Sequence, residues 1–186
     1  MPSPIGHSLS GLFVYFLFNR KRFSNWMVLA LLLFMANLPD LDFLLGFIKG
    51  NPNAYHHQFM HSLIFVVAVA LIIAFAFNKL LTQGRYFLSF IWLCVLGFAH
   101  LFLDALSRDT SAPYGMQLLW PFSKEYFMFP FTIFADITRS SENSTFISSL
   151  FSLHNFEALL LEIVILTPVV IFTFLKFRKP KVCDVS

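Results

Sequence analysis

Five long apolar stretches alternate with shorter polar segments along the chain. Charged, proline, glycine or asparagine residues bound each stretch, as is typical of helix ends and turns. The stretches run from Ile5 to Phe18, Trp26 to Ile48, Leu63 to Phe77, Phe87 to Leu106 and Phe156 to Phe177. Because a helix needs about 20 apolar residues to cross a bilayer, the pattern predicts an all-α, multi-pass membrane helical bundle of about five helices.

Two of the five stretches depart from a simple membrane span. The first is short for a full crossing, so a tilted, partly inserted or re-entrant helix stays open as an alternative. The second contains the sequence NLPDLD, where Pro39 is expected to end or kink the helix.

The composition supports lipid as the main solvent of the chain. Hydrophobic residues make up 58% of the 186 positions and charged residues 12%, outside the range of soluble domains. The formal net charge is +3, but the basic residues form short runs and no continuous patch. We therefore expect one membrane-embedded domain over residues 1–186, in contact with the lipid bilayer, and no direct binding of nucleic acid.

The basic residues also predict an orientation. Nine of the thirteen lysines and arginines follow the first, third and fifth stretches, and the remaining four lie on the opposite side of a five-span chain. The positive-inside rule places the nine in the cytoplasm. The predicted topology has the N-terminus outside and the C-terminus inside, with residues 107–155 forming a long extracytoplasmic loop.

Ionisable side chains gather at the outer ends of the predicted helices. His100 and Asp104 lie four residues apart, so they share one helix face, and His57 and His61 repeat that spacing. Imidazole and carboxylate are ligands for zinc, with manganese and iron as alternatives. The candidate metal ligands are His7, Asp40, Asp42, His56, His61, His100 and Asp104.

Seven such groups exceed the three or four that one ion takes, which allows a two-metal centre. The alternative is a set of structural pairs, such as His100 hydrogen-bonded to Asp104. A single pair would not decide between these interpretations. The whole set at one face favours a functional site, because buried charges are costly in a membrane.

Cations at a water-facing membrane surface are suited to hydrolysis, since they lower the pKa of a bound water and polarise a phosphoryl or carbonyl oxygen. Asp42 and Asp104 are the candidate catalytic carboxylates. Asp42 is the expected base, although Asp40 and Asp42 could exchange roles. Glu162 lies one turn inside the last stretch, where it is expected to orient a metal-bound histidine or water.

Several motifs together resemble the bacterial inner-membrane metal-dependent hydrolase family, which includes YdjM-like proteins and is also described as LexA-binding. The motifs are SPIGHSLSG, NLPDLDFL, YHHQFMHSL, HLFLD and YGMQLLWPFS, and they cover most of the chain. The resemblance implies a location in the bacterial inner membrane and ligand roles for His56 and His61. Ser62 belongs to the same motif and is a candidate supporting residue.

The third motif departs from the family's usual form, His-Arg-Gly-x-Thr-His-Ser. His57 and Gln58 replace its arginine and glycine, so His57 is a candidate for contacting an anionic substrate group rather than a family-type ligand. The order of histidines and aspartates is also similar to zinc-dependent phospholipase C, which implies a helical phosphoester hydrolase.

We therefore expect a membrane-embedded zinc-type hydrolase that acts on a lipid or lipid-linked phosphoester at the extracytoplasmic face. Residues 107–155 would form its lid, with Trp120 as an apolar contact and Arg108 or Lys124 available to a phosphate. The alternative is a non-catalytic metal-binding protein or metal transporter. Ionisable groups at one end of the bundle argue against transport, because transporters bind near the bilayer midplane.

Overall fold

The fold is built from α-helices, and the long helices lie where the apolar stretches predict them. The computed structural model describes residues 1–18, 25–110 and 113–177, and within them it contains seven α-helices and no strand. The helices are α1 (Pro4–Phe18), α2 (Trp26–Asn37), α3 (Asp42–Ile48), α4 (Leu63–Thr82), α5 (Tyr86–Ala105), α6 (Asn143–Ser149) and α7 (Leu153–Phe177). Three short 3-10 turns are η1 (Pro39–Leu41), η2 (Pro52–Tyr55) and η3 (Phe59–His61). The all-α prediction is confirmed.

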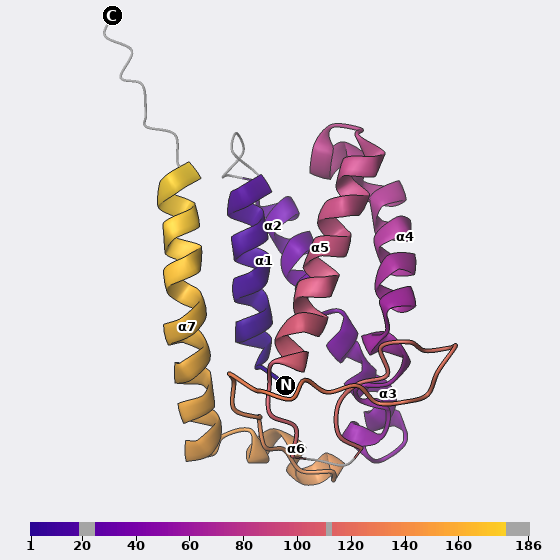
Figure 1. Cartoon of the computed structure of the whole chain (residues 1–186), viewed down its shortest axis with the longest axis vertical. Helices are drawn as coiled ribbons and strands as arrows, with labels where there is room; N and C mark the ends of the chain where they lie inside the picture. Colours follow the sequence, from indigo (N-terminus) through magenta and orange to yellow (C-terminus); the bar gives the residue numbers. More distant parts are fainter. Residues whose placement is uncertain (19–24, 111–112, 178–186) are drawn as a thin grey trace, which may run out of the picture.

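The long helices stand side by side along the longest axis of the molecule (Figure 1). Helix α1 packs against α2, α5 and α7, while α5 also contacts α2 and α4. The turn between α4 and α5 and the end of α7 lie at one end, called the turn end below. Helices α3 and α6 and the start of α1 lie at the other, called the site end.

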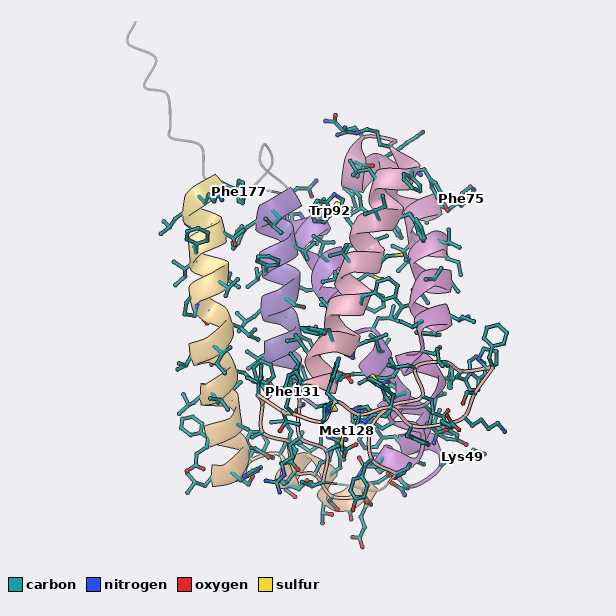
Figure 2. The ribbon with its side chains drawn as sticks, viewed as in Figure 1. Lys49, Phe75, Trp92, Met128, Phe131 and Phe177 are labelled. Atoms are coloured by element: carbon teal, nitrogen blue, oxygen red, sulfur yellow. The ribbon has the colours of Figure 1, made fainter. Side chains whose placement is uncertain are left out.

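Side chains that face outward from the bundle are apolar over most of its length. Phe75, Val164 and Phe172 are 79%, 67% and 64% exposed, and Phe75 lies toward the turn end in Figure 2. Lipid, not water, is the solvent that favours such a surface. The buried core consists of apolar side chains packed between the helices. Its residues include Val14, Leu32, Ala36, Ala70, Ala74 and Leu93.

Three helices are long and apolar enough to cross a membrane, namely α4, α5 and α7, and the bent pair α2 and η1–α3 could make a fourth. Helix α1 has 15 residues, fewer than the about 20 that a perpendicular crossing needs. The chain is therefore a membrane protein with three or four candidate spans. The expected fifth span, formed by α1, stays a prediction.

The break after α2 decides where two aspartates lie. Pro39 removes a backbone donor and ends the helix, and the chain continues through η1 into α3 with a bend of 64°. Asp40 lies within η1, whereas Asp42 begins α3. Two residues only two positions apart thus face different neighbours.

A close approach of α4 and α5 brings their ends near the same point. A Cβ atom on Gly97 would lie 2.5 Å from Val66 Cγ1, so only glycine lets the two helices pack this closely. Ser62 caps the start of α4 by accepting a hydrogen bond from the Phe65 N–H. His61, directly before this cap, is held beside the last turns of α5.

The segment 107–155, expected to be a loop, is only partly irregular. It contains α6 and the first turn of α7, which begins at Leu153 rather than at the expected Phe156. Ser152 explains the earlier start, because its Oγ accepts from the Asn155 N–H at 3.2 Å and caps the helix. Asn155 Oδ1 accepts from the Thr138 N–H at 2.8 Å, and Asn155 Nδ2 donates to the Thr138 carbonyl at 2.8 Å. The segment is thereby tied to the first turn of the helix.

Candidate metal centre

Four ligand-type side chains from three parts of the chain converge at the site end. Asp40 comes from η1, His61 from η3, and His100 and Asp104 from the last turns of α5. One ligand atom from each lies within 4.8 Å of the others. His61 and His100 are fully buried, and Asp104 is 4% exposed. We call these four residues the carboxylate centre.

The spacing of the four atoms fits a single metal ion. Asp104 Oδ2 lies 3.4 Å from His61 Nε2 and 3.1 Å from His100 Nε2, and the two Nε2 atoms are 3.4 Å apart. Asp40 Oδ1 lies 3.5 Å and 3.8 Å from the same two nitrogens. Metal–ligand bonds of about 2.0–2.2 Å in a tetrahedron separate neighbouring ligands by about 3.3–3.6 Å. The centre therefore has the dimensions of a tetrahedral site.

Unpaired buried oxygens at the centre point to the same interpretation. Both carboxylate oxygens of Asp40 and of Asp104 are buried and have no hydrogen-bond partner within the described residues. A carboxylate buried without a partner is costly, and a cation would compensate its charge. The histidine and aspartate cluster could thus hold a metal ion.

A hydrogen bond to His100 and an ion-pair contact to His61, each on the far side of the ring, fix which nitrogen faces the centre. His100 Nδ1 lies 2.8 Å from the Ala36 carbonyl oxygen, a contact that requires a proton on Nδ1 and leaves the Nε2 lone pair free. His61 Nδ1 lies 3.1 Å from Asp42 Oδ2, and a carboxylate in that position is the usual partner of a metal-bound histidine. Both rings are set up to bind through Nε2.

Asp42 therefore lies on the opposite side of His61 from the carboxylate centre. Its Oδ1 is 3.0 Å from His56 Nδ1, and its Oδ2 accepts from the His57 N–H at 3.2 Å. These contacts, with the one to His61, engage both oxygens of a fully buried side chain. Sequence reasoning assigned Asp42 to a ligand or base role, whereas this placement favours a positioning role.

His7 approaches the other oxygens of the two shared carboxylates. Its Nε2 lies 3.4 Å from Asp104 Oδ1 and 3.9 Å from Asp40 Oδ2. The ring is fully buried and stacks on His100 with the centroids 3.9 Å apart. Neither ring nitrogen has a hydrogen-bond partner in the described part of the chain. His7 and the two carboxylates thus provide three ligand atoms beside the first set.

A second set of ligand-type atoms consists of His56, His57 and His61, which we call the imidazole group. Burial lowers the pKa of His56 well below its usual value and that of His57 to about 4, so both rings are neutral at pH 7. His57 has a left-handed backbone with φ of 62°, and this conformation directs its N–H to Asp42. Two carboxylates lie beside the group, Asp42 at 3.0 Å from His56 Nδ1 and Asp109 at 3.6 Å from His57 Nδ1.

Two predicted supporting residues hold the backbone near the site. Glu162 on α7 is fully buried and accepts hydrogen bonds from the Ser3 N–H at 2.7 Å and the Ser3 hydroxyl at 2.5 Å. Glu162 therefore holds the backbone just before His7, whereas the sequence led us to expect a contact with a metal-bound histidine or water. Ser62 Oγ caps α4 and donates to the Phe59 carbonyl.

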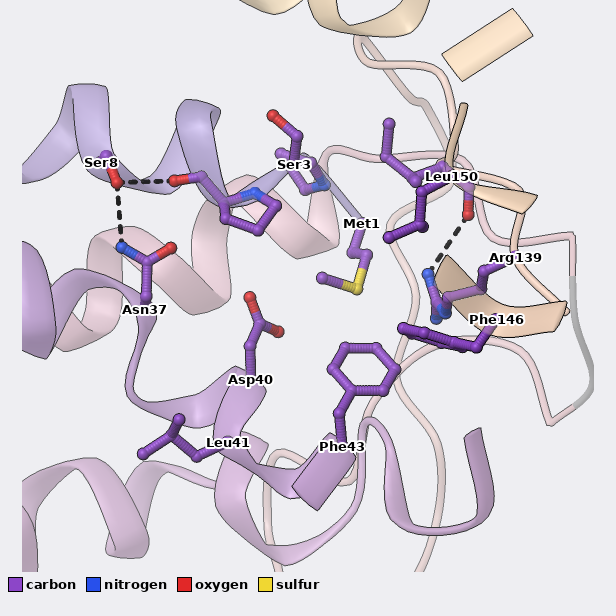
Figure 3. A pocket seen from close by; sticks show the side chains of 13 residues that line it. Met1, Ser3, Ser8, Asn37, Asp40, Leu41, Phe43, Arg139, Phe146 and Leu150 are labelled. Atoms are coloured by element: carbon purple, nitrogen blue, oxygen red, sulfur yellow. Dashed lines mark hydrogen bonds between the residues drawn. The ribbon is translucent and has the colours of Figure 1, made fainter. Parts of the chain in front are cut away.

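A cavity of about 360 Å³ opens beside Asp40 (Figure 3). The expected substrate contacts Arg108, Trp120 and Lys124 are not among the described residues that line it. Arg108 and Lys124 are exposed, and Trp120 packs against the Phe59 ring. The basic residue that lines the cavity is Arg139. Sequence reasoning missed it because it lies in a serine-rich tract with no spaced partner.

Comparisons with known proteins identify a family. The family model described as YdjM inner membrane protein matches residues 1–179. No curated protein and no solved structure matches the sequence.

Proposed function

Because the chain belongs to the YdjM inner membrane protein family, we propose that it is a membrane-embedded, metal-dependent hydrolase of a lipid or lipid-linked phosphoester. The carboxylate centre carries this proposal, because it is a buried, tetrahedrally spaced ligand set that adjoins a cavity through Asp40. A site that only stabilised the fold would not need access to a cavity.

We propose two cation positions, the first of them at the carboxylate centre. Asp40, His61, His100 and Asp104 would hold the first, and His7 with the opposite oxygens of the two aspartates would hold the second. Two imidazoles and two carboxylates around one tetrahedron favour zinc over magnesium or calcium, which prefer oxygen ligands. Three ligand atoms at the second position leave room for a water or substrate oxygen.

Bound cations of this kind lower the pKa of a water and neutralise charge on a phosphoryl oxygen. The residues of the chain prepare the site for that chemistry. Asp42 and the Ala36 carbonyl hold the Nδ1 side of His61 and His100, so that both Nε2 atoms face inward. The surrounding burial excludes bulk water.

Asp40 is better placed than Asp42 to present a cation-bound water to the cavity. Asp40 is the member of the carboxylate centre that lines the cavity, whereas Asp42 already contacts His56, His61 and the His57 N–H. Of the two role assignments that the sequence left open, we therefore favour the ligand role for Asp40, because both of its oxygens would bind cations, which themselves lower the pKa of the attacking water. Asp104 would act as a shared ligand.

We further propose that the site end faces the extracytoplasmic side. Lys79 and Arg85 flank the α4–α5 turn and Lys176 ends α7, so these basic residues share the turn end. The other basic residues of the predicted cytoplasmic group, in 20–22 and 178–181, lie outside the described residues. Cys183, also outside them, should stay unlabelled by an impermeant maleimide in intact cells, and its labelling would contradict this orientation.

The activity is tested with purified, metal-loaded protein and a panel of labelled phospholipids and lipid-linked phosphoesters. We expect release of a phosphate-containing or lipid product by the wild type and loss of at least about a thousandfold in His100→Gln, because catalytic metals contribute several kcal/mol. His154→Gln is the matched control, since His154 contacts Asp136 outside the centre. Metal uptake into proteoliposomes without any hydrolysis would favour the transport alternative instead.

A further inference from the structure

The cavity beside Asp40 combines an apolar lining with opposite charges at two sides. Its apolar wall includes Met1, Leu41, Phe43, Ile137, Phe146 and Leu150. Asp40 and Arg139 lie on opposite sides of it (Figure 3). The volume of about 360 Å³ is near the lower end of the about 300–1,000 Å³ of small-molecule sites. A single short apolar group fits such a space better than a whole diacyl lipid.

Arg139 is held in place by contacts that leave part of its guanidinium available. Its Nε donates to Asn53 Oδ1 at 2.9 Å, and Nη1 donates to the Ile137 carbonyl at 3.3 Å. The guanidinium carbon lies 5.1 Å from the centre of the Phe43 ring, within the range of a cation–π contact. These two hydrogen bonds use two of the five donors of an arginine.

The group that orients Arg139 is itself fixed. Asn53 Nδ2 donates to the Ser140 carbonyl and to Ser141 Oγ, both at 3.3 Å. The arginine therefore bridges η2 and the segment after α5, and its plane is set before any ligand arrives. Such a preorganised fork suits the oxygens of a phosphate.

The charges make the cavity selective for anions only when the carboxylate centre holds cations. Without a cation, the Asp40 carboxylate at one side would repel an anion. When cations occupy the centre, an anion is attracted both to the side of the cavity at Asp40 and to the side at Arg139. The apolar wall between them adds burial for a hydrocarbon group.

We infer that this cavity binds the phosphate-proximal part of a single-chain amphiphile, with its phosphate between the metal centre and Arg139 and its hydrocarbon against the apolar wall. The inference rests on the proposed function for the identity of the anion as a phosphoester. It assigns Arg139, rather than Arg108 or Lys124, as the substrate-contacting cation.

Equilibrium binding of hexyl phosphate to the full-length, zinc-loaded protein tests this assignment without turnover. We expect hexyl phosphate to bind at least about tenfold more tightly than inorganic phosphate, because the chain buries several CH₂ groups, and hexanol, which lacks the phosphate, to compete only at concentrations far above those of hexyl phosphate. Arg139→Ala should weaken hexyl phosphate by about tenfold or more while the zinc content stays unchanged. The control Lys49→Ala removes an exposed cation at the same end (Figure 2) and should bind like wild type.

Equal binding by the wild type and Arg139→Ala, competition by hexanol as strong as that by hexyl phosphate, or loss of zinc from the variant would each overturn the assignment. If Arg139→Ala fails to fold, Leu150→Trp provides the second test. It fills the apolar wall and should weaken hexyl phosphate without changing binding of inorganic phosphate, and an equal loss for both ligands would contradict the model. Intact hexyl phosphate binding with no hydrolysis of any phosphoester would count against the proposed function alone.

Discussion

The carboxylate centre and the imidazole group share His61, yet their surroundings differ in charge. The first combines two imidazoles with the carboxylates of Asp40 and Asp104, whose oxygens have no hydrogen-bond partner within the described residues. The second contains three imidazoles, and its nearest acid, Asp42, is already engaged by them. A divalent cation in a buried site needs anionic ligands to balance its charge, so the difference favours metal binding at the carboxylate centre over the imidazole group.

The largest expected effect comes from removing a carboxylate that both metal positions share. Asp40→Ala deletes a ligand of each position. We expect hydrolysis to fall by at least about a thousandfold and thermal stabilisation by added zinc to disappear. Thermal unfolding at increasing zinc concentrations measures this stabilisation in the wild type and in the variant. Wild-type stabilisation in this variant would move the metal site away from the carboxylate centre.

A smaller loss is expected at His7, which serves only the second position. His7→Gln should reduce the metal content from two ions per chain to one, because His61 and His100 still hold the first position. Elemental analysis of protein equilibrated with zinc and then desalted gives the ratio. A ratio of two in the variant would show that His7 is a structural ring stacked on His100.

Asp42 tests the boundary between the two groups. Asp42→Asn keeps the shape of the side chain but removes the charge that faces His61 Nδ1. Loss of such a supporting carboxylate weakens metal binding by about 10–100-fold, so we expect a higher zinc dissociation constant with the stoichiometry preserved. A complete loss of metal would instead identify Asp42 as a direct ligand, as the sequence first suggested.

His57 should have the smallest effect on metal. His57→Ala and His57→Gly both remove the ring, and we expect zinc affinity to change by less than the about tenfold that marks a supporting group. The two variants differ at the left-handed backbone, with φ of 62°, where glycine is favoured by about 1 kcal/mol over alanine. The glycine variant should therefore unfold at the higher temperature. A tenfold loss of zinc affinity in both variants would instead identify the imidazole group as a metal site.

The helices could be predicted from the sequence because hydropathy and helix-ending residues are local signals. The apolar stretches correspond to α1, to α2 with η1 and α3, to α4, to α5 and to α7. Their alternating directions also place the ends of α2 and α5 and the starts of α1, α4 and α7 at the site end (Figure 1). The number of spans was less accessible, because α1 is short and Pro39 bends the second stretch by 64°.

The sequence predicted which residue types gather at the site, but not which of the aspartates faces the metal centre and which supports a histidine. Spacing placed His100 and Asp104 on one helix face, and the structure brings His7, Asp40 and His61 to them. Which side of His61 each aspartate faces depends on the turn geometry of η1 and η3, and no periodic pattern encodes it. Arg139 reaches the cavity through tertiary contacts with Asn53 and Phe43, so its sequence neighbourhood carried no signal.

The most direct measurement is the metal content of the wild-type protein and Asp104→Ala, each purified from cells without added metal. Asp104 contributes one oxygen to each proposed position, so its removal should empty both. We predict about two equivalents of a divalent metal, with zinc predominant, in the wild type and none in the variant. A wild-type protein without stoichiometric metal, or a variant that retains both ions, would contradict the proposal that this cluster is a metal centre.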